Sequence, residues 1–170
     1  MGLPKACARL PAGDTFLSRL ASMYREAGLG VVVVVGAHAD AVKAAHPSLT
    51  FTLNDAWADG QFSSVRAGLR EVTDRGAGLV AVHPVDAPSV AAATVQALAN
   101  ALGSARACVV PRHKGRSGHP VLLSREASLA LEGDLDSPSL EAALRPFTPV
   151  YVDVEDGAVT DNFNAPADIL

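Results

Sequence analysis

The stretch Gly78-Leu79-Val80-Ala81-Val82-His83-Pro84-Val85-Asp86-Ala87-Pro88 is a short apolar run followed by a stiff turn that carries a carboxylate. The run Gly78–His83 has the length and composition of a buried β-strand. Open α/β sheets bind their ligands beyond the carboxyl ends of their strands, and Asp86 lies at such an end. The flanking prolines limit where its side chain points. This stretch therefore predicts an α/β sheet with a ligand-binding aspartate at its edge.

The rest of the chain alternates short β-branched runs with longer Ala- and Leu-rich segments, the pattern of βα units around a mostly parallel sheet. Val31–Val35 has no polar alternation, which indicates a central strand covered on both faces. The predicted strands are Gly30–Val35, Leu49–Leu53, Gly78–His83, Ala107–Pro111, Val121–Leu123 and Val150–Val154. The predicted helices are Thr15–Ala27, Ala37–Ala45, Phe62–Thr73, Ser89–Leu102, Pro138–Leu144 and a short one from Pro166, with Ser89 and Ser137 as expected caps.

Length and composition indicate one globular domain, residues 1–170, with 49% hydrophobic residues. A net charge of −4 without a basic run argues against a polynucleotide partner. The longest apolar run, Val31–Val35, is too short to span a bilayer, and no signal peptide is visible. Cys7 and Cys108 form no disulfide framework or metal spacing. A cytoplasmic protein without a membrane partner is expected.

Asp86 has two interpretations on sequence grounds. A Mg²⁺ ion is held by one or two carboxylates together with water and phosphate oxygens, so a strand-terminal aspartate suits a metal site. Alternatively, Asp86 caps the helix predicted from Ser89. The preceding strand favours the metal. His83 is expected to have a secondary positioning role, although a histidine at a strand end is usually structural.

A second candidate site lies in the segment Asn54–Leu69, where Gly60 precedes a helix and Ser63 and Ser64 lie near its start. Free backbone N–H groups and the helix dipole attract phosphate or ring oxygens there. The alternative is an ordinary serine cap, with Trp57 filling the core. The residues alone favour that alternative.

Two later stretches also combine turn residues with polar groups. Gly115-Arg116-Ser117-Gly118-His119-Pro120 follows a basic segment, and its glycines let the backbone approach a ligand closely. Asp161-Asn162-Phe163-Asn164-Ala165-Pro166-Ala167-Asp168 offers amide oxygens to a metal. A solvated basic loop and an Asx-turn are the corresponding ordinary explanations.

Taken in this order, these stretches and the start Met1-Gly2-Leu3-Pro4-Lys5 resemble the nucleotidyltransferases that attach CMP or GMP to molybdopterin, a MobA-like NTP transferase family. In that family a strand leads into Leu-Ala-Ala-Gly-x-Ser-x-Arg-Met-Gly-x-Pro-Lys. The segment around Trp57 resembles Asn-x-x-Trp-x-x-Gly-Met-x-x-Ser-Leu, and the loop from Gly115 resembles the cytidylyltransferase form Gly-Arg-x-Gly-His-Pro. The ending resembles Asn-Ile-Asn-Thr-Pro-Glu-Asp.

The resemblance implies a three-layer α/β/α Rossmann-like fold of the nucleotide-diphospho-sugar transferase type. It implies Mg²⁺-dependent transfer of an NMP, with CTP favoured as the NTP, to molybdopterin with release of pyrophosphate. Lys5 and Asp86 take the catalytic roles, and the metal ligands are Asp86, Asn162 and, next in order, Asn164. Substrate-binding roles fall to Gly2, Asn54, Gly60, Ser63, Ser64, His83, Arg116, Gly118 and His119. A molybdoenzyme is a further candidate partner.

The first half of the family's loop and the strand before it have no counterpart here. That segment, about 15 residues for a strand and a Gly-rich turn, would place a strand near the middle of the sheet and cradle the triphosphate. Its absence predicts two unpaired strand edges and an apolar gap. A misassigned start is the favoured explanation, and artificial shortening or a degenerate relative are the others. Alternative functions are transfer to another phosphorylated acceptor, or a catalytically impaired relative that holds the cofactor as a chaperone.

Overall fold

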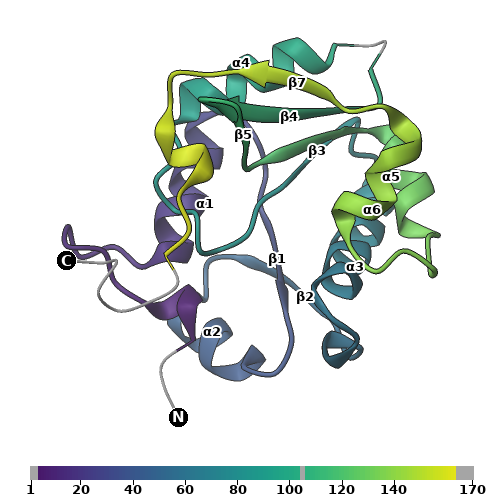
Figure 1. Ribbon diagram of the computed structural model, residues 1–170. Helices are drawn as coiled ribbons and strands as arrows, with labels where there is room; N and C mark the ends of the chain where they lie inside the picture. Colours follow the sequence, from purple (N-terminus) through teal and green to yellow (C-terminus); the bar gives the residue numbers. More distant parts are fainter. Residues whose placement is uncertain (1–3, 104–105, 164–170) are drawn as a thin grey trace.

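A computed structural model describes residues 4–103 and 106–163 of the chain. Two groups of strands are flanked by helices on both sides (Figure 1). The first group pairs β1 (Val32–Val35) with β2 (Thr50–Leu53) in parallel. The second has the order β3-β6-β4-β5, with β7 beside β4. Its strands are β3 (Leu79–Val82), β4 (Cys108–His113), β5 (Arg116–Ser117), β6 (Val121–Ser124) and β7 (Val150–Asp153).

Six α-helices connect or cover these strands in the described part of the chain. They are α1 (Phe16–Glu26), α2 (Ala39–Ala45), α3 (Gln61–Asp74), α4 (Ala92–Leu102), α5 (Arg125–Glu132) and α6 (Leu140–Leu144). Short 3₁₀ turns add η1 (Lys5–Cys7), η2 (Trp57–Asp59), η3 (Arg145–Phe147) and η4 (Gly157–Thr160). The order of strands and helices confirms the α/β class expected from the sequence.

The strand directions are mixed rather than uniformly parallel. β6 pairs antiparallel with both β3 and β4, so β3 and β4 run in the same direction, and β7 is parallel to β4. β5 is also antiparallel to β4. The reversal follows from a tight turn after β4, where Lys114 and Gly115 have positive φ angles of 48° and 80°. No helix separates β4 from β6, so the chain returns beside the strand it has just left.

All six predicted strands are present, and their ends differ from the predicted ones by at most two residues. The helix α5 and the two-residue strand β5 were not predicted. Two predicted caps are wrong: α4 begins at Ala92 rather than after Ser89, and Ser139 caps α6 instead of Ser137. α1 begins as expected, because Thr15 and Ser18 form a reciprocal capping box. The helix expected from Pro166 lies outside the described residues.

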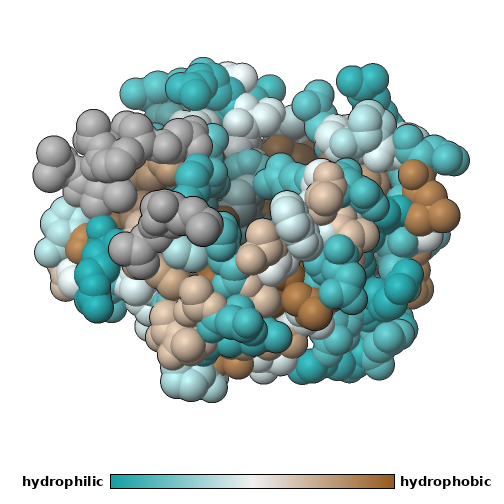
Figure 2. Space-filling view, turned by 90° about the horizontal axis from the view of Figure 1, so that it is seen from below, coloured by the Kyte–Doolittle hydropathy of each residue, from teal (hydrophilic) through white to brown (hydrophobic). Residues whose placement is uncertain are grey.

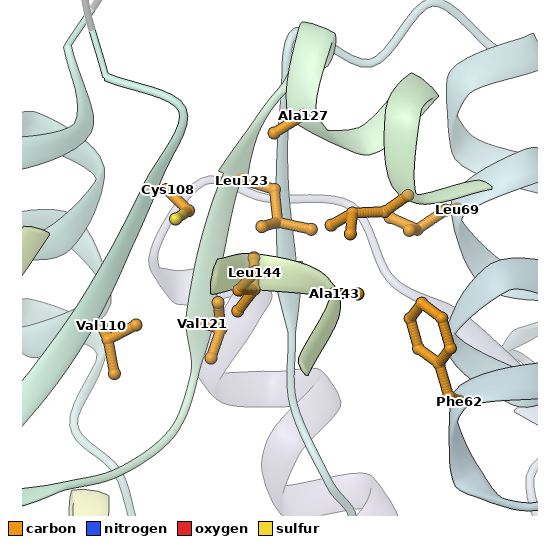
Figure 3. Packing of buried hydrophobic residues seen from close by; sticks show 10 residues of the cluster. Phe62, Leu69, Cys108, Val110, Val121, Leu123, Ala127, Ala143 and Leu144 are labelled. Carbon is orange, nitrogen blue, oxygen red and sulfur yellow. The ribbon is translucent and has the colours of Figure 1, made fainter. Parts of the chain in front are cut away.

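The largest cluster of the core packs α3, α5 and α6 against one face of the second group of strands (Figure 3). Leu69 of α3, Leu123 of β6 and Leu131 of α5 are each at most 1% exposed. α4 covers the other face, with Leu98 and Leu102 packed on Val109 and Leu122. Within the described residues, no helix is both long enough and apolar enough to cross a membrane.

An apolar cavity of about 880 Å³ separates the two groups of strands; we call it the interstrand groove. Its side walls are β1 and β3, and residues of α1 and α3 line it as well. In the described structure β1 pairs only with β2, and β3 pairs only with β6. The gap expected from the sequence is therefore present, and β1 does not form the centre of a continuous sheet.

Truncation of Leu123 tests the core. Leu123→Ala removes a side chain with no exposed surface and should lower the free energy of unfolding by about 2–5 kcal/mol. The matched control Leu129→Ala alters a leucine that is 48% exposed and should change it by less than about 0.5 kcal/mol. Urea denaturation measures both. Equal effects would contradict the assignment of Leu123 to the core.

Candidate functional site

Lys5 and Asp86 lie together at the carboxyl end of β3. Lys5 Nζ is 3.1 Å from Asp86 Oδ2, and the side chains are 44% and 24% exposed. A solvent-exposed ion pair of this kind contributes little to stability. Lysine is a flexible point charge that also suits a phosphate. The geometry thus brings together the two residues predicted to be catalytic.

Asp86 does not cap α4, which removes the ordinary explanation for this residue. The N-cap of α4 is Ala91, and its backbone N–H donates to Asp156 Oδ2 at 3.0 Å. Thr94 Oγ1 donates to the same carboxylate oxygen at 2.8 Å. Asp156, which the sequence did not single out, therefore anchors this helix start and leaves Asp86 for another role.

The end of the described chain returns to Asp86. The backbone N–H of Phe163 donates to the carbonyl oxygen of Asp86 at 2.8 Å, and the Phe163 ring packs edge-on against Phe16 at 5.6 Å. The exposed Asn162 is therefore one residue from a direct contact with Asp86. Asn164 and Gly2, the other residues of the predicted site at the chain ends, lie outside the described residues.

Two histidines, His83 and His119, lie near the Asp86 carboxylate. His83 Nδ1 lies 2.8 Å from the hydroxyl of Tyr24, and its Nε2 lies 2.9 Å from the carbonyl oxygen of Ala87. The ring of His119 stacks on that of His83 at 6.5 Å. His119 Nδ1 is buried and has no hydrogen-bond partner within the described structure. Because the Ala87 carbonyl accepts a hydrogen bond, the neutral His83 ring carries its proton on Nε2 and accepts from Tyr24.

Burial keeps these rings neutral. Burial, followed by the neighbouring His119, lowers the pKa of His83 to about 4. Burial also lowers the pKa of His119, against the opposing effect of Asp86. The pKa of the Tyr24 hydroxyl is raised, again by burial. The pair Tyr24–His83, whose tyrosine the sequence suggested only as packing, thus forms a neutral support beneath Asp86.

The loop from β5 to β6 places Gly118 and His119 against η4. A Cβ atom on Gly118 would lie 2.0 Å from the carbonyl oxygen of Val159, and the His119 N–H donates to that oxygen at 2.8 Å. The close approach of the η4 backbone thus explains why residue 118 is a glycine. Arg116 lies on the exposed β5.

The predicted base-binding segment forms an internal network before α3. Asn54 Nδ2 donates to the hydroxyls of Ser63 and Ser64 at 2.8 and 3.0 Å. Ser63 is buried and donates to the carbonyl of Gly60, whose φ of 102° favours glycine. No side chain caps α3, and Trp57 is 50% exposed, so neither the serine cap nor the core tryptophan of the ordinary interpretation is correct.

No group of three His, Cys, Asp or Glu side chains that could hold an ion occurs among the described residues. Magnesium needs only one or two carboxylates when substrate phosphates complete its shell. The partly exposed Asp86, with Asn162 next to the residue whose N–H binds the Asp86 carbonyl, fits that type of site.

The sequence of residues 1–150 matches the MobA-like NTP transferase domain family. The chain belongs to this family. Membership assigns it to the nucleotidyltransferases, enzymes that use NTP substrates. No curated protein sequence matches it.

The solved structures agree with this fold. Rv0371c of Mycobacterium tuberculosis H37Rv is 23% identical, with a TM-score of 0.80, and the match covers 99% of this chain and 88% of that one. Its complex with manganese is 24% identical, with a TM-score of 0.78 and coverage of 97% and 88%. Molybdopterin-guanine dinucleotide biosynthesis protein A of Archaeoglobus fulgidus is 20% identical, with a TM-score of 0.73 and coverage of 99% and 88%. The nucleotide-diphospho-sugar transferase fold is thereby confirmed.

The buried His83 predicts a pH dependence of stability. Its pKa of about 4 in the folded chain lies below the ordinary value of about 6.5 in the unfolded chain, so the unfolded state binds the proton more readily. Stability is full above about pH 6.5 and falls as the pH drops toward 4. Denaturant titrations between pH 4 and 8 should show this slope, and His83→Gln should reduce it. An NMR-measured His83 pKa near 6.5 would contradict the prediction.

Gly118→Ala tests the contact between this loop and η4. The added methyl group meets backbone at 2.0 Å, so η4 or the loop must move, and we expect a loss of about 1–3 kcal/mol in the free energy of unfolding. Gly78→Ala is the matched control because a Cβ there meets nothing within 4 Å. Thermal unfolding of both variants provides the measurement. An unchanged midpoint for Gly118→Ala would refute the close approach.

Proposed function

We propose that this protein transfers a nucleotide, with CMP favoured, from an NTP to molybdopterin and releases pyrophosphate. The observation that carries the proposal is the exposed ion pair between Lys5 and Asp86 at the end of β3. The family supplies the reaction class. The identity of the base and of the acceptor rests on the resemblance of the loop carrying Arg116, Gly118 and His119 to the cytidylyltransferase form.

The reaction joins a phosphate oxygen of the acceptor to the α-phosphorus of the NTP while the bond to the leaving pyrophosphate breaks. Transfer of this kind depends on positioning and charge neutralisation and needs no protein nucleophile. Asp86, with Asn162 and Asn164 as further ligands, would hold Mg²⁺, which supplies charge neutralisation for the phosphate oxygens. Lys5 would leave Asp86 and bind the triphosphate. The neutral pair Tyr24–His83 would fix the turn that carries Asp86.

The substrate contacts follow the same arrangement. The uncapped start of α3 presents backbone N–H groups to a ligand, and Ser64 lies at the edge of the interstrand groove nearby. Asn54, Gly60 and Ser63 would shape this region for the base and ribose. On the other side, His119, Arg116 and Gly118 would border the acceptor, with Gly2 near the phosphates.

Other acceptors are compatible with this fold. The similar structures include 4-diphosphocytidyl-2C-methyl-D-erythritol synthase, at 18% identity and a TM-score of 0.70, and one fold carries many functions. A phosphorylated acceptor other than molybdopterin is therefore the second candidate. The open interstrand groove favours a third candidate, a relative that holds the cofactor for a molybdoenzyme without transferring a nucleotide.

Calorimetric titration with CTP and GTP in the presence of Mg²⁺ tests the proposal. We expect CTP to bind, and Asp86→Asn to weaken Mg²⁺-dependent binding by about 100-fold because one metal ligand loses its charge. Lys5→Ala should weaken triphosphate binding by about 10-fold or more. The matched control Asp74→Asn alters an exposed carboxylate at the end of α3 and should bind like the parent chain. Binding of CTP that is indifferent to Asp86→Asn would overturn the metal assignment, and binding of no NTP would favour the third candidate.

A further inference from the structure

The single tryptophan of the chain lies exposed beside the carboxyl end of β1. Trp57 in η2 is 50% exposed. A Cβ atom on Gly36, the residue after β1, would lie 2.6 Å from Trp57 Cβ and 2.8 Å from its Cγ. The φ angle of Gly36 lies outside the left-handed region, so contact with Trp57, rather than the backbone angle, requires a glycine there. The side chain is thus packed at its base on Gly36, while half of the residue stays open to solvent.

A buried polar network holds the backbone that carries Trp57. The N–H of Ala56 donates to Asn54 Oδ1 at 3.1 Å, and the Ala56 carbonyl oxygen lies 2.9 Å from the Ser63 hydroxyl. Asn54 and Ser63 are each 6% exposed. The N–H of Gly60 donates to the carbonyl oxygen of Trp57 itself at 3.4 Å. The backbone on both sides of Trp57 is therefore fixed.

This network stabilises the orientation of Trp57 rather than a core. Buried polar side chains cost free energy unless they find partners, and apolar packing holds a surface turn without that cost. Trp57 offsets little of it through its own packing, because half of the residue is exposed. A large aromatic side chain that is already fixed loses little conformational entropy when a ligand contacts it. A fixed, exposed tryptophan therefore indicates a binding surface.

The surroundings of Trp57 suit a small ligand. Gly36 lines both the interstrand groove and a second cavity of about 360 Å³ formed by Gly36 to Ala41, a volume in the range of ligand pockets. Figure 2 views the face toward which β1 runs in Figure 1. Among the described residues of that face, hydrophobic atoms lie between hydrophilic ones rather than in one broad patch, which favours a small ligand over a protein surface.

The charges near Trp57 indicate which part of a ligand it meets. Asp55 and Asp59 lie on either side of Trp57 in the sequence and are exposed. Carboxylates repel a phosphate, and they accept hydrogen bonds from the amino groups of heteroaromatic rings, as they do from cytosine. Lys5 supplies positive charge at the end of β3. A ligand with both parts would thus place its phosphates toward Lys5 and its ring toward Trp57.

We propose that Trp57 is a stacking platform for a planar heteroaromatic ring, either the base of the NTP or the pterin of the acceptor. The inference rests on the proposed function for these two substrates and adds the residue that binds the ring. Rings stack on an aromatic side chain whatever their hydrogen-bonding pattern. Trp57 therefore supplies affinity, while the neighbouring carboxylates favour rings that carry amino groups.

The fluorescence of the parent chain tests the inference without any substitution, because Trp57 is its only tryptophan. CTP with Mg²⁺, or 6-hydroxymethylpterin, should quench the emission after correction for ligand absorbance. Tripolyphosphate has no ring and should leave the emission unchanged. Equal quenching by tripolyphosphate and CTP would overturn the inference, since it would report charge or movement rather than a stacked ring. Emission unchanged by both ring-bearing probes overturns it as well.

Calorimetric titration of variants separates the ring from the phosphates. Trp57→Ala should weaken binding of the stacked ring by about 10-fold or more and leave the affinity for tripolyphosphate unchanged. Trp57→Phe keeps an aromatic face and should retain most of the affinity. The matched control Tyr151→Ala removes an equally exposed aromatic side chain on β7 and should bind every probe like the parent chain. Thermal unfolding checks that each variant is folded.

The two ring-bearing probes distinguish the source of the ring. A loss confined to CTP assigns Trp57 to the base, a loss confined to the pterin assigns it to the acceptor, and a loss with both means that the rings share one site. Unchanged affinity of Trp57→Ala for both overturns the inference, even where CTP binding depends on Asp86 and the proposed function stands. Conversely, a loss at Trp57→Ala, with CTP binding indifferent to Asp86→Asn, keeps the stacking platform and overturns the metal assignment.

Discussion

The structure depends on one constraint: a buried strand must hydrogen-bond its backbone on both edges. β6 shows the constraint met, because it lies between β3 and β4 and its residues Val121, Leu122 and Leu123 are almost fully buried. β1 and β3 have equally apolar sequences, but within the described structure each pairs on one edge only. The interstrand groove is the consequence, and most of the apolar side chains of these two strands remain half-buried because of it.

The same topology explains why polar residues gather where they do. β3 ends at the turn that carries Asp86, β1 ends beside Ala6, and the segment after β7 returns through η4 to place Phe163 on the Asp86 backbone. Four stretches far apart in sequence therefore meet at the carboxyl ends of the strands, where α/β sheets bind ligands. The neutral Tyr24–His83 pair adds rigidity there without adding a charge that would compete with Lys5.

Much of the fold could be predicted from sequence, because apolar runs such as Val31–Val35 and Leu79–Val82 carry a strong local signal. The helix starts were harder: the carboxylate that holds the start of α4 belongs to Asp156, about sixty residues away in sequence, and no local pattern reveals a distant partner. α5 was missed because it follows β6 without a break, with Ser124 serving as both the last strand residue and the cap. In the site, the pairing of Lys5 with Asp86 could be predicted only from the order of the motifs. The hydrogen bond between Tyr24 and His83 could not be predicted, since a buried tyrosine near a helix end ordinarily indicates packing.

The interstrand groove also bears on how the two halves of the site are coupled. Lys5 and Asp86 sit at its end, with Asp86 attached to the second group of strands through β3, while the uncapped start of α3 follows directly from the first group through β2. α3 contacts both groups, so it is the main described element that spans them. Helices packed through apolar contacts can slide by an ångström or more, whereas a strand hydrogen-bonded on both edges fixes register. Under the proposed function, a triphosphate placed between Asp86 and the start of α3 would therefore need the two groups of strands to be held rigidly relative to each other, because a displacement of about 1 Å can cost a large factor in rate.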